Sequence, residues 1–163
     1  MLLFLKKYAI INKSNYCKEY KLIMKKSKII MVIDGQGGGL GKIIVEKIKK
    51  ANLNIQVLGI GTNTVATMAM LKAGADDAAT GENAIIYNTQ YADYIIGAVG
   101  IIAANSMLGE ISPAMANAVS SSYGLKLLIP ANKCNLFIAG VQENGLSEKI
   151  DEAIDKIRLD NPE

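Results

Sequence analysis

The chain contains no histidine and only two cysteines, Cys17 and Cys134, which lie far apart in the sequence. Without histidine the protein lacks the commonest general base and the commonest ligand of transition metals. A zinc site of the usual histidine and cysteine type is therefore excluded, and we expect no bound metal. Two isolated cysteines form no disulfide framework, which favours a reducing, cytoplasmic setting.

Long apolar runs and a strong overall charge are also missing. The longest apolar run, residues 94–104, is too short to cross a bilayer, and the apolar residues at 2–5 precede their lysines, unlike a secretory signal. Residues 1–28 carry a net charge of +7, whereas the remainder carries −4. The rest of the chain is thus mildly acidic and lacks the excess of positive charge that is typical of nucleic-acid-binding proteins. We expect neither a membrane nor nucleic acid as a partner.

The first 23 residues differ from the rest, because they are rich in Lys, Asn, Ile and Tyr and contain no Gly or Pro. We expect residues 1–23 to be a basic extension that is disordered or not translated, with Met24 as the natural start. A basic amphipathic segment that touches a membrane or a partner is the alternative. Residues 24–163 have a length that suits one domain with its own core.

A cluster of five glycines separates a strand pattern from a helix pattern. Residues 28–33 are apolar and β-branched, as is typical of a buried strand, and apolar residues recur at helical spacing from Leu40 to Ala51. A glycine turn at a helix start presents unpaired N–H groups and the positive end of the helix dipole, which together bind phosphate. We expect a phosphate-bearing ligand here, touching Asp34, Gly35, Gln36, Gly37, Gly38, Gly39, Leu40 and Gly41. The alternative is a tight turn that binds nothing, its amides paired with the chain's own carbonyls.

The spacing of these glycines differs from the two best-known phosphate loops. Leu40 stands where the pattern G-x-G-x-x-G requires its third glycine, and Ile43 replaces the hydroxyl residue of the Walker A pattern. The spacing G-x-x-x-G-x-G, through Gly35, Gly39 and Gly41, resembles the cofactor turn of the short-chain dehydrogenase/reductase family. That resemblance implies a nucleotide cofactor such as NAD(P).

Two features argue against the chemistry of that family. Its hydride transfer needs Tyr and Lys four residues apart on one helix face, whereas the nearest pair here, Tyr123 and Lys126, is three apart. In dinucleotide-binding domains an acid at the end of the second strand binds the ribose. This chain offers Gly61, Thr62 and Asn63 there, and no carboxylate. The resemblance therefore supports a nucleotide cradle and not the reductase reaction.

Strand and helix patterns alternate along the rest of the chain. We expect strands at 55–60, 94–99, 125–129 and 136–139, and helices at 65–73, from Ser112 to 122, and after a cap at Ser147. Residues 76–83 indicate a polar connection, whose acids are more often solvated than metal-bound. The alternation predicts a three-layer, Rossmann-like doubly wound α/β domain with a mainly parallel sheet of five or six strands.

Polar residues follow several of the expected strands. Ligands of open parallel sheets bind beyond the carboxyl ends of the strands, where the strand order reverses. The segments at these ends, 34–41, 61–64, 100–110 and 130–135, are rich in Gly, Asn, Ser or Thr. We therefore add Thr62, Asn63, Asn105 and Ser106 to the expected ligand contacts.

Two other functions remain open at this stage. A small metabolic enzyme would use Glu110 as a general base or hydrogen-bond anchor, or Cys134 as a nucleophile. A non-catalytic homo-oligomeric or regulatory protein would instead show a large apolar surface patch and no pocket at the strand ends.

Several blocks from Lys28 onward resemble one known family. They are Asp34-Gly35-Gln36-Gly37-Gly38-Gly39, Gly61-Thr62-Asn63, Ala79-Thr80-Gly81-Glu82-Asn83-Ala84 and Asn105-Ser106-Met107-Leu108-Gly109-Glu110. These blocks are similar to the motifs of a bacterial family catalogued as domain of unknown function 3842. The resemblance implies a compact bacterial domain and supplies no reaction, because the family has no assigned activity.

Overall fold

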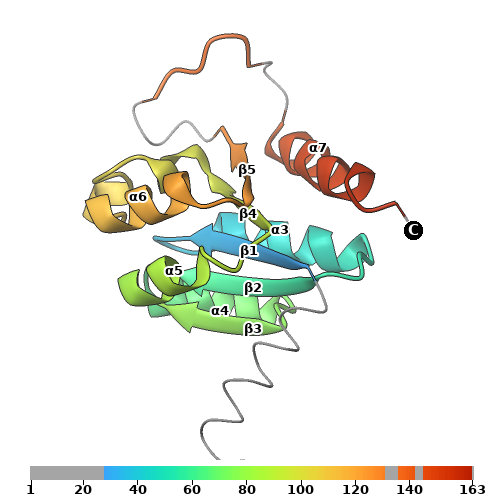
Figure 1. Cartoon of the computed structure of the whole chain (residues 1–163), viewed down its shortest axis with the longest axis horizontal. Helices are drawn as coiled ribbons and strands as arrows, with labels where there is room; N and C mark the ends of the chain where they lie inside the picture. The colour runs from blue at the N-terminus through green and yellow to red at the C-terminus, as the bar shows by residue number, and fades with distance from the viewer. Residues whose placement is uncertain (1–27, 131–135, 142–144, 163) are drawn as a thin grey trace, which may run out of the picture.

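A computed structural model describes residues 28–130, 136–141 and 145–162. Five strands form its sheet: β1 (Ile29–Asp34), β2 (Gln56–Gly61), β3 (Asp77–Thr80), β4 (Tyr94–Ala98) and β5 (Leu125–Ile129). They lie in the order β3-β2-β1-β4-β5, and every neighbouring pair is parallel (Figure 1). The predicted Rossmann-like α/β fold is confirmed, with a sheet of five strands in the described part of the chain. Strand order reverses between β1 and β4.

Helices cover both faces of the sheet. On one face lie α3 (Gly39–Lys50), α4 (Thr64–Lys72) and α7 (Leu146–Leu159); on the other lie α5 (Glu82–Asn88), η1 (Val99–Ile102) and α6 (Pro113–Ser121). The short η2 (Met107–Gly109) belongs to the loop that follows η1. The three layers arise because parallel neighbours need a crossover connection, here usually a helix, that packs back on the sheet.

Strand β1 is the centre of the core. All six of its residues are buried, as expected for a strand with helices on both faces. Ile30 and Val32 pack on the side of α3 and α7, whereas Met31 and Ile33 pack on the side of α5 and α6. Burial of one such side chain contributes about 1.5–3 kcal/mol. The strand is thus a firm support for the glycine turn that follows it.

Local sequence signals locate most helix starts. Ser112 caps α6 as predicted, and Asn63 caps α4. The side chain of each accepts a hydrogen bond from the backbone N–H three residues later. The prediction that Ser147 caps the last helix was wrong. Gly145 is the N-cap of α7, and Oε2 of Glu148 accepts the N–H of Gly145 at 3.0 Å. Glu148, in the first turn of α7, thus makes the capping contact that was expected of Ser147.

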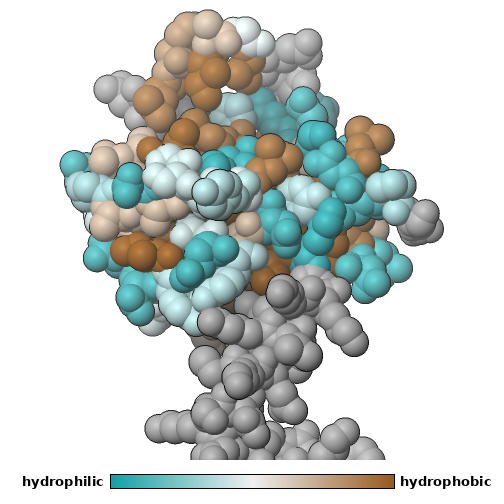
Figure 2. Space-filling view, in the orientation of Figure 1, coloured by the Kyte–Doolittle hydropathy of each residue, from teal (hydrophilic) through white to brown (hydrophobic). Residues whose placement is uncertain are grey.

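Two predictions about strands were wrong. The segment 76–83, expected to be a polar connection, contains β3, an edge strand that pairs with β2 alone. The first and last residues of β3 are exposed, so its sequence lacks the apolar pattern of a buried strand. Residues 136–139 are not a strand. Their side chains Leu136, Phe137 and Ile138 are exposed, and Figure 2 shows apolar surface over this segment. Apolar composition alone does not supply the neighbouring strand that a sheet requires.

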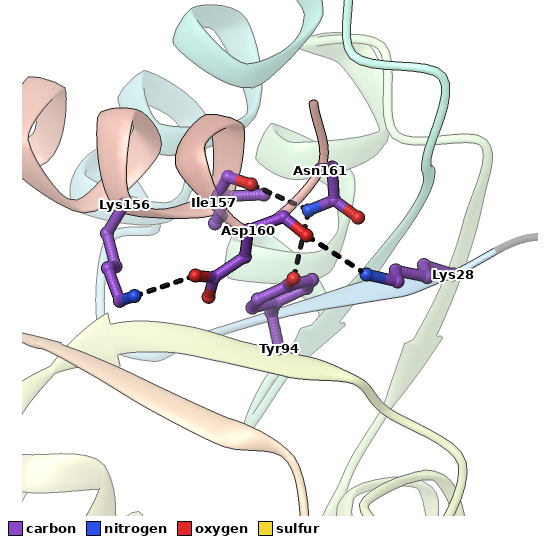
Figure 3. A network of polar contacts seen from close by, with 6 residues as sticks. All are labelled: Lys28, Tyr94, Lys156, Ile157, Asp160 and Asn161. Carbon is purple, nitrogen blue, oxygen red and sulfur yellow. Dashed lines mark hydrogen bonds and ion pairs between the residues drawn. The ribbon is translucent and has the colours of Figure 1, made fainter. Parts of the chain in front are cut away.

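Hydrogen bonds join the carboxyl end of α7 to the amino ends of β1 and β4 (Figure 3). Nδ2 of Asn161 donates to the hydroxyl of Tyr94 at 2.9 Å, and Nζ of Lys28 donates to the carbonyl of Asp160 at 3.5 Å. The Tyr94 residue is buried, and Asn161 supplies a hydrogen-bond partner for its hydroxyl. With this end held, the opposite end of α7, Leu146, lies beside the glycine turn.

Candidate functional site

The glycine turn joins β1 to α3 at the point where the strand order reverses. The N–H of Gly38 donates to the carbonyl of Gly35 at 3.0 Å and closes the turn. Gly38 has a φ of 70°, and a Cβ there would lie 2.6 Å from Cα of Ala66. Only glycine fits both conditions. In open parallel sheets this position is where ligands bind.

Asp34, the last residue of β1, bonds to backbone N–H groups on both sides of the turn, one of them in the first turn of α3. Its side chain is buried, and Oδ1 accepts the N–H of Gly35 at 2.8 Å while Oδ2 accepts the N–H of Gly41 at 2.6 Å. A negative charge is favourable at a helix amino terminus. A Cβ on Gly41 would lie 2.7 Å from Cβ of Asp34, so glycine at 41 permits this approach. Asp34 and Gly41 therefore build the turn, whatever it binds.

Glu110 holds the turn from a distant part of the sequence. Its Oε2 accepts hydrogen bonds from the hydroxyl of Thr62, from the backbone N–H of Gln36 at 2.9 Å and from Nδ2 of Asn63 at 3.1 Å. These hydrogen bonds hold the pKa of Glu110 below its usual value, and the bond from Thr62 has the largest effect. The carboxylate is therefore ionised at neutral pH and is a weak base. Its contacts fit the role of a hydrogen-bond anchor better than that of a general base.

These contacts bring a carboxylate to the end of β2, where the local sequence has none. We call Gln36, Thr62, Asn63 and Glu110 the β2-end network. Nδ2 of Asn63 also donates to the carbonyl of Gln36 at 3.0 Å, which ties the turn to α4. A Cβ at Gly35 would lie 2.7 Å from both Oε2 of Glu110 and Oγ1 of Thr62. The network thus packs directly on the turn.

The loop that carries Glu110 has an unusual backbone. Asn105, Met107 and Leu108 have φ values of 63°, 55° and 59°, and Gly109 follows with 90°. Residues with side chains rarely adopt this region, at a cost of order 1–3 kcal/mol each. Only Gly109 signals this in the sequence, so the path of the loop could not be foreseen.

Asn105 and Ser106 shape this loop. The N–H of Asn105 donates to the carbonyl of Ile111 at 2.7 Å, and the hydroxyl of Ser106 donates to the carbonyl of Gly100 at 2.5 Å. Neither residue lines the cavity described below. Cys134, the other candidate for chemistry, lies outside the described residues.

Three amides of the turn have no acceptor in the described part of the chain. They are the N–H groups of Gly37, Gly39 and Leu40. The turn residues 35–40 line a cavity of about 420 Å³. A Cβ at Gly37 or Gly39 would meet no described atom within 4 Å. Among the described residues, the turn therefore presents three unpaired N–H groups beside a cavity.

The remaining walls of the cavity come from separate elements. Ala98 ends β4, Met107 belongs to the loop that carries Glu110, and Leu146 begins α7; Asp34 lies at the base of the turn. Sequence reasoning did not include Ala98, Met107 or Leu146. The positions of Ala98 at a strand end and of Met107 within the strand-end segment 100–110 were usable signals, whereas Leu146 had none. No described Lys or Arg lines this cavity.

The acids outside the turn have structural partners. Asp76 accepts from Nζ of Lys49 at 2.6 Å and from the N–H of Val57 at 2.7 Å, and Asp77 accepts from Nε2 of Gln56. Among the described residues no cluster of three or more His, Cys, Asp or Glu could hold a metal ion. None of the helices in these ranges has the length and apolar character needed to cross a membrane.

The fold and the turn define a Rossmann-like α/β domain with a glycine-rich turn at its strand-order reversal. The family model described as Domain of unknown function (DUF3842) matches residues 29–160. The chain belongs to this family, as its sequence blocks indicated.

A comparison with solved structures also gives a match. The chain is similar to a dodecameric FMN-dependent Ubix-like decarboxylase from Escherichia coli O157:H7, with a TM-score of 0.41 and 16% sequence identity. The match covers 80% of this chain and 76% of that one. A comparison with curated proteins finds no match.

Proposed function

We propose that this protein binds a small phosphate-bearing nucleotide at the 35–41 turn. The phosphate lies against the N–H groups of Gly37, Gly39 and Leu40, and the rest of the ligand occupies the adjoining cavity. NAD(P), which the glycine spacing implies, is one member of this class of ligands.

The observation that carries the proposal is the contrast among the five glycines. Gly35, Gly38 and Gly41 are required by close neighbours within the chain, whereas Gly37 and Gly39 face open space. A glycine costs roughly 0.5–1 kcal/mol of stability relative to alanine in regular structure. Since packing does not require Gly37 and Gly39, close approach of a ligand to the backbone is the reason we infer for them.

The amino end of α3 supports an anion at this place. Three unpaired donors lie within four residues, at the positive end of a twelve-residue helix. A pocket at the strand ends also favours binding over a purely structural role. The alternative of a small enzyme would use Glu110 or Cys134. The lowered pKa of Glu110 makes it a poor base at neutral pH, and Cys134 lies outside the described residues.

A homo-oligomer is compatible with this function. The exposed side chains of Leu136, Phe137 and Ile138 form an apolar surface that favours self-association. Sedimentation velocity of the full chain measures the oligomeric state directly. A monomer at all accessible concentrations would contradict this part of the proposal.

Thermal unfolding of the full chain tests the binding proposal. We expect Tm to rise with AMP, FMN or another phosphate-bearing nucleotide and not with adenosine or riboflavin, which lack the phosphate. A ligand present at 100 times its Kd stabilises the folded state by about 2.7 kcal/mol. No rise with any nucleotide at millimolar concentration would overturn the proposal.

A variant locates the binding. Gly37→Leu adds a bulky side chain whose Cβ meets no described atom within 4 Å, so we expect a folded protein that no longer responds to the nucleotide. Ser121→Leu adds a leucine at the exposed carboxyl end of α6, away from the turn, and should respond like the unmodified protein. Equal binding by Gly37→Leu would place the ligand elsewhere.

A further inference from the structure

One side of the glycine turn is closed by the protein itself. Glu110 bonds to Thr62, Asn63 and the N–H of Gln36 at the end of β2. In dinucleotide-binding α/β domains the end of the second strand receives the ribose of the adenosine half. Here a carboxylate, an amide and a hydroxyl bond to one another at that position. A second nucleotide half would have to displace the β2-end network.

In the described part of the chain, the opposite side of the turn adjoins a cavity. The cavity lies toward β4 and is walled by Ala98, Met107 and Leu146, and neither Glu110, Thr62 nor Asn63 is among its lining residues. Its volume of about 420 Å³ falls in the lower part of the range typical of small-molecule sites. The apolar side chains suit a ring or another apolar group, attached to a phosphate that rests on the turn.

The charges around the turn favour a ligand with a single phosphate. Asp34 lines the cavity, and its charge is already stabilised by two N–H groups. Glu110 adds a second carboxylate, whose Oε2 lies 2.9 Å from the nitrogen of Gln36. No described lysine or arginine lines the cavity to offset a pyrophosphate. Both carboxylates repel a negatively charged ligand, so each additional phosphate binds less favourably.

From these observations we infer that the site is one-sided and takes a phosphomonoester, of which a mononucleotide is the natural example. Its phosphate contacts Gly37, Gly39 and Leu40, and its ring extends toward Met107 and Leu146. Dinucleotides such as NAD(P) and FAD are excluded, because their second half has no place at the end of β2. This inference rests on the proposed function and narrows it to one class of nucleotide.

Calorimetric titration of the full chain with matched ligand pairs tests the inference. AMP is compared with NAD⁺, and FMN with FAD, because each dinucleotide contains the corresponding mononucleotide unit. We expect the better mononucleotide to bind at least tenfold more tightly than its dinucleotide. Equal or tighter binding of the dinucleotide would overturn the inference and leave the proposed function standing. Failure of all four to bind would overturn the proposed function itself.

A second measurement assigns the discrimination to the β2-end network. Glu110→Ala removes both the bulk and the charge at this end, so we expect the affinity gap between AMP and NAD⁺, or between FMN and FAD, to shrink severalfold. Glu152→Ala, which alters an exposed acid on α7 outside this cavity, should leave the gap unchanged. A folded Glu110→Ala variant with an unaltered gap would contradict the inference. If that variant does not fold, the comparison on the unmodified protein decides.

Discussion

Oε2 of Glu110 lies 2.9 Å from the backbone nitrogen of Gln36, although 74 residues separate the two in the sequence. The contact joins the loop after β4 to the turn after β1, and through Thr62 and Asn63 it also reaches the end of β2. One carboxylate thereby links three strand ends around the proposed binding site. The shape of the turn depends on this link as well as on its glycines.

The pH dependence of stability should report this carboxylate. Because the folded-state pKa of Glu110 is lowered, its contribution to stability is present above the unfolded-state pKa of about 4.3 and is lost as pH falls through the folded-state value. Glu110→Gln should lower the free energy of unfolding at neutral pH by roughly 1 kcal/mol, because the side chain is only half-buried and partly screened. The variant should also lose less stability on acidification than the unmodified protein, as urea denaturation at several pH values measures.

The matched control for this experiment is Glu152→Gln. Glu152 is exposed on α7, so its replacement should leave the slope of stability against pH as it is. If Glu110→Gln showed the same acid response as the unmodified protein, the hydrogen bonds to Glu110 would contribute nothing to folding.

Alanine at two adjacent glycine positions should change the stability of the protein to very different extents. Gly38→Ala places a Cβ 2.6 Å from Cα of Ala66 and forces alanine to a φ of 70°, so we expect a loss of about 2–4 kcal/mol from overpacking and backbone strain. Gly37→Ala meets no described atom within 4 Å and should change stability by less than about 1 kcal/mol. Chemical denaturation of both variants gives the comparison. Similar losses in the two would show that Gly37 is also required by the fold.

Gly39→Ala should separate stability from binding. Gly39 is the first residue of α3, and alanine there should stabilise the helix by up to about 0.5–1 kcal/mol. The same methyl group projects beside an N–H that we assign to the phosphate, so affinity for AMP or FMN should fall at least tenfold. Thermal unfolding and calorimetry measure the two effects on one sample.

The control for Gly39→Ala is Lys50→Ala, at the exposed last residue of the same helix. It should leave affinity unaltered, because it lies at the end of α3 away from the turn. A stabilised Gly39→Ala variant that kept full affinity would remove residue 39 from the binding site.

Asn161→Ala should loosen α7. The substitution leaves the hydroxyl of buried Tyr94 without its partner, at an expected cost of about 1–3 kcal/mol. Hydrogen exchange of the α7 amides should accelerate more than that of β1. Lys156→Ala breaks only an exposed ion pair with Asp160 and should cost less than about 1 kcal/mol. Equal effects of the two would show that the Tyr94 contact does not anchor the helix.

Neighbouring residues were enough to locate the elements around the turn. The apolar run of β1 is continuous because both faces of the strand are covered, and Asn63 and Ser112 mark helix starts through bonds to residues only three positions away. Such signals act within a few residues, so a linear pattern records them. The same reasoning failed for β3, since an edge strand has too few buried positions to show its period. It also failed for residues 136–139, which are apolar but do not form a strand.

The details of the site depended on contacts between distant segments. β1 lies between β4 and β2 in the sheet, so Glu110 reaches the end of β2 only because the loop after β4 extends past the end of β1. Equally, five glycines look alike in a linear sequence. Their neighbours in space show that Gly38 packs against α4, whereas an added Cβ at Gly37 or Gly39 would meet no described atom within 4 Å. The sequence shows where the glycines are, but the packing of the whole domain determines which atoms lie close to each of them.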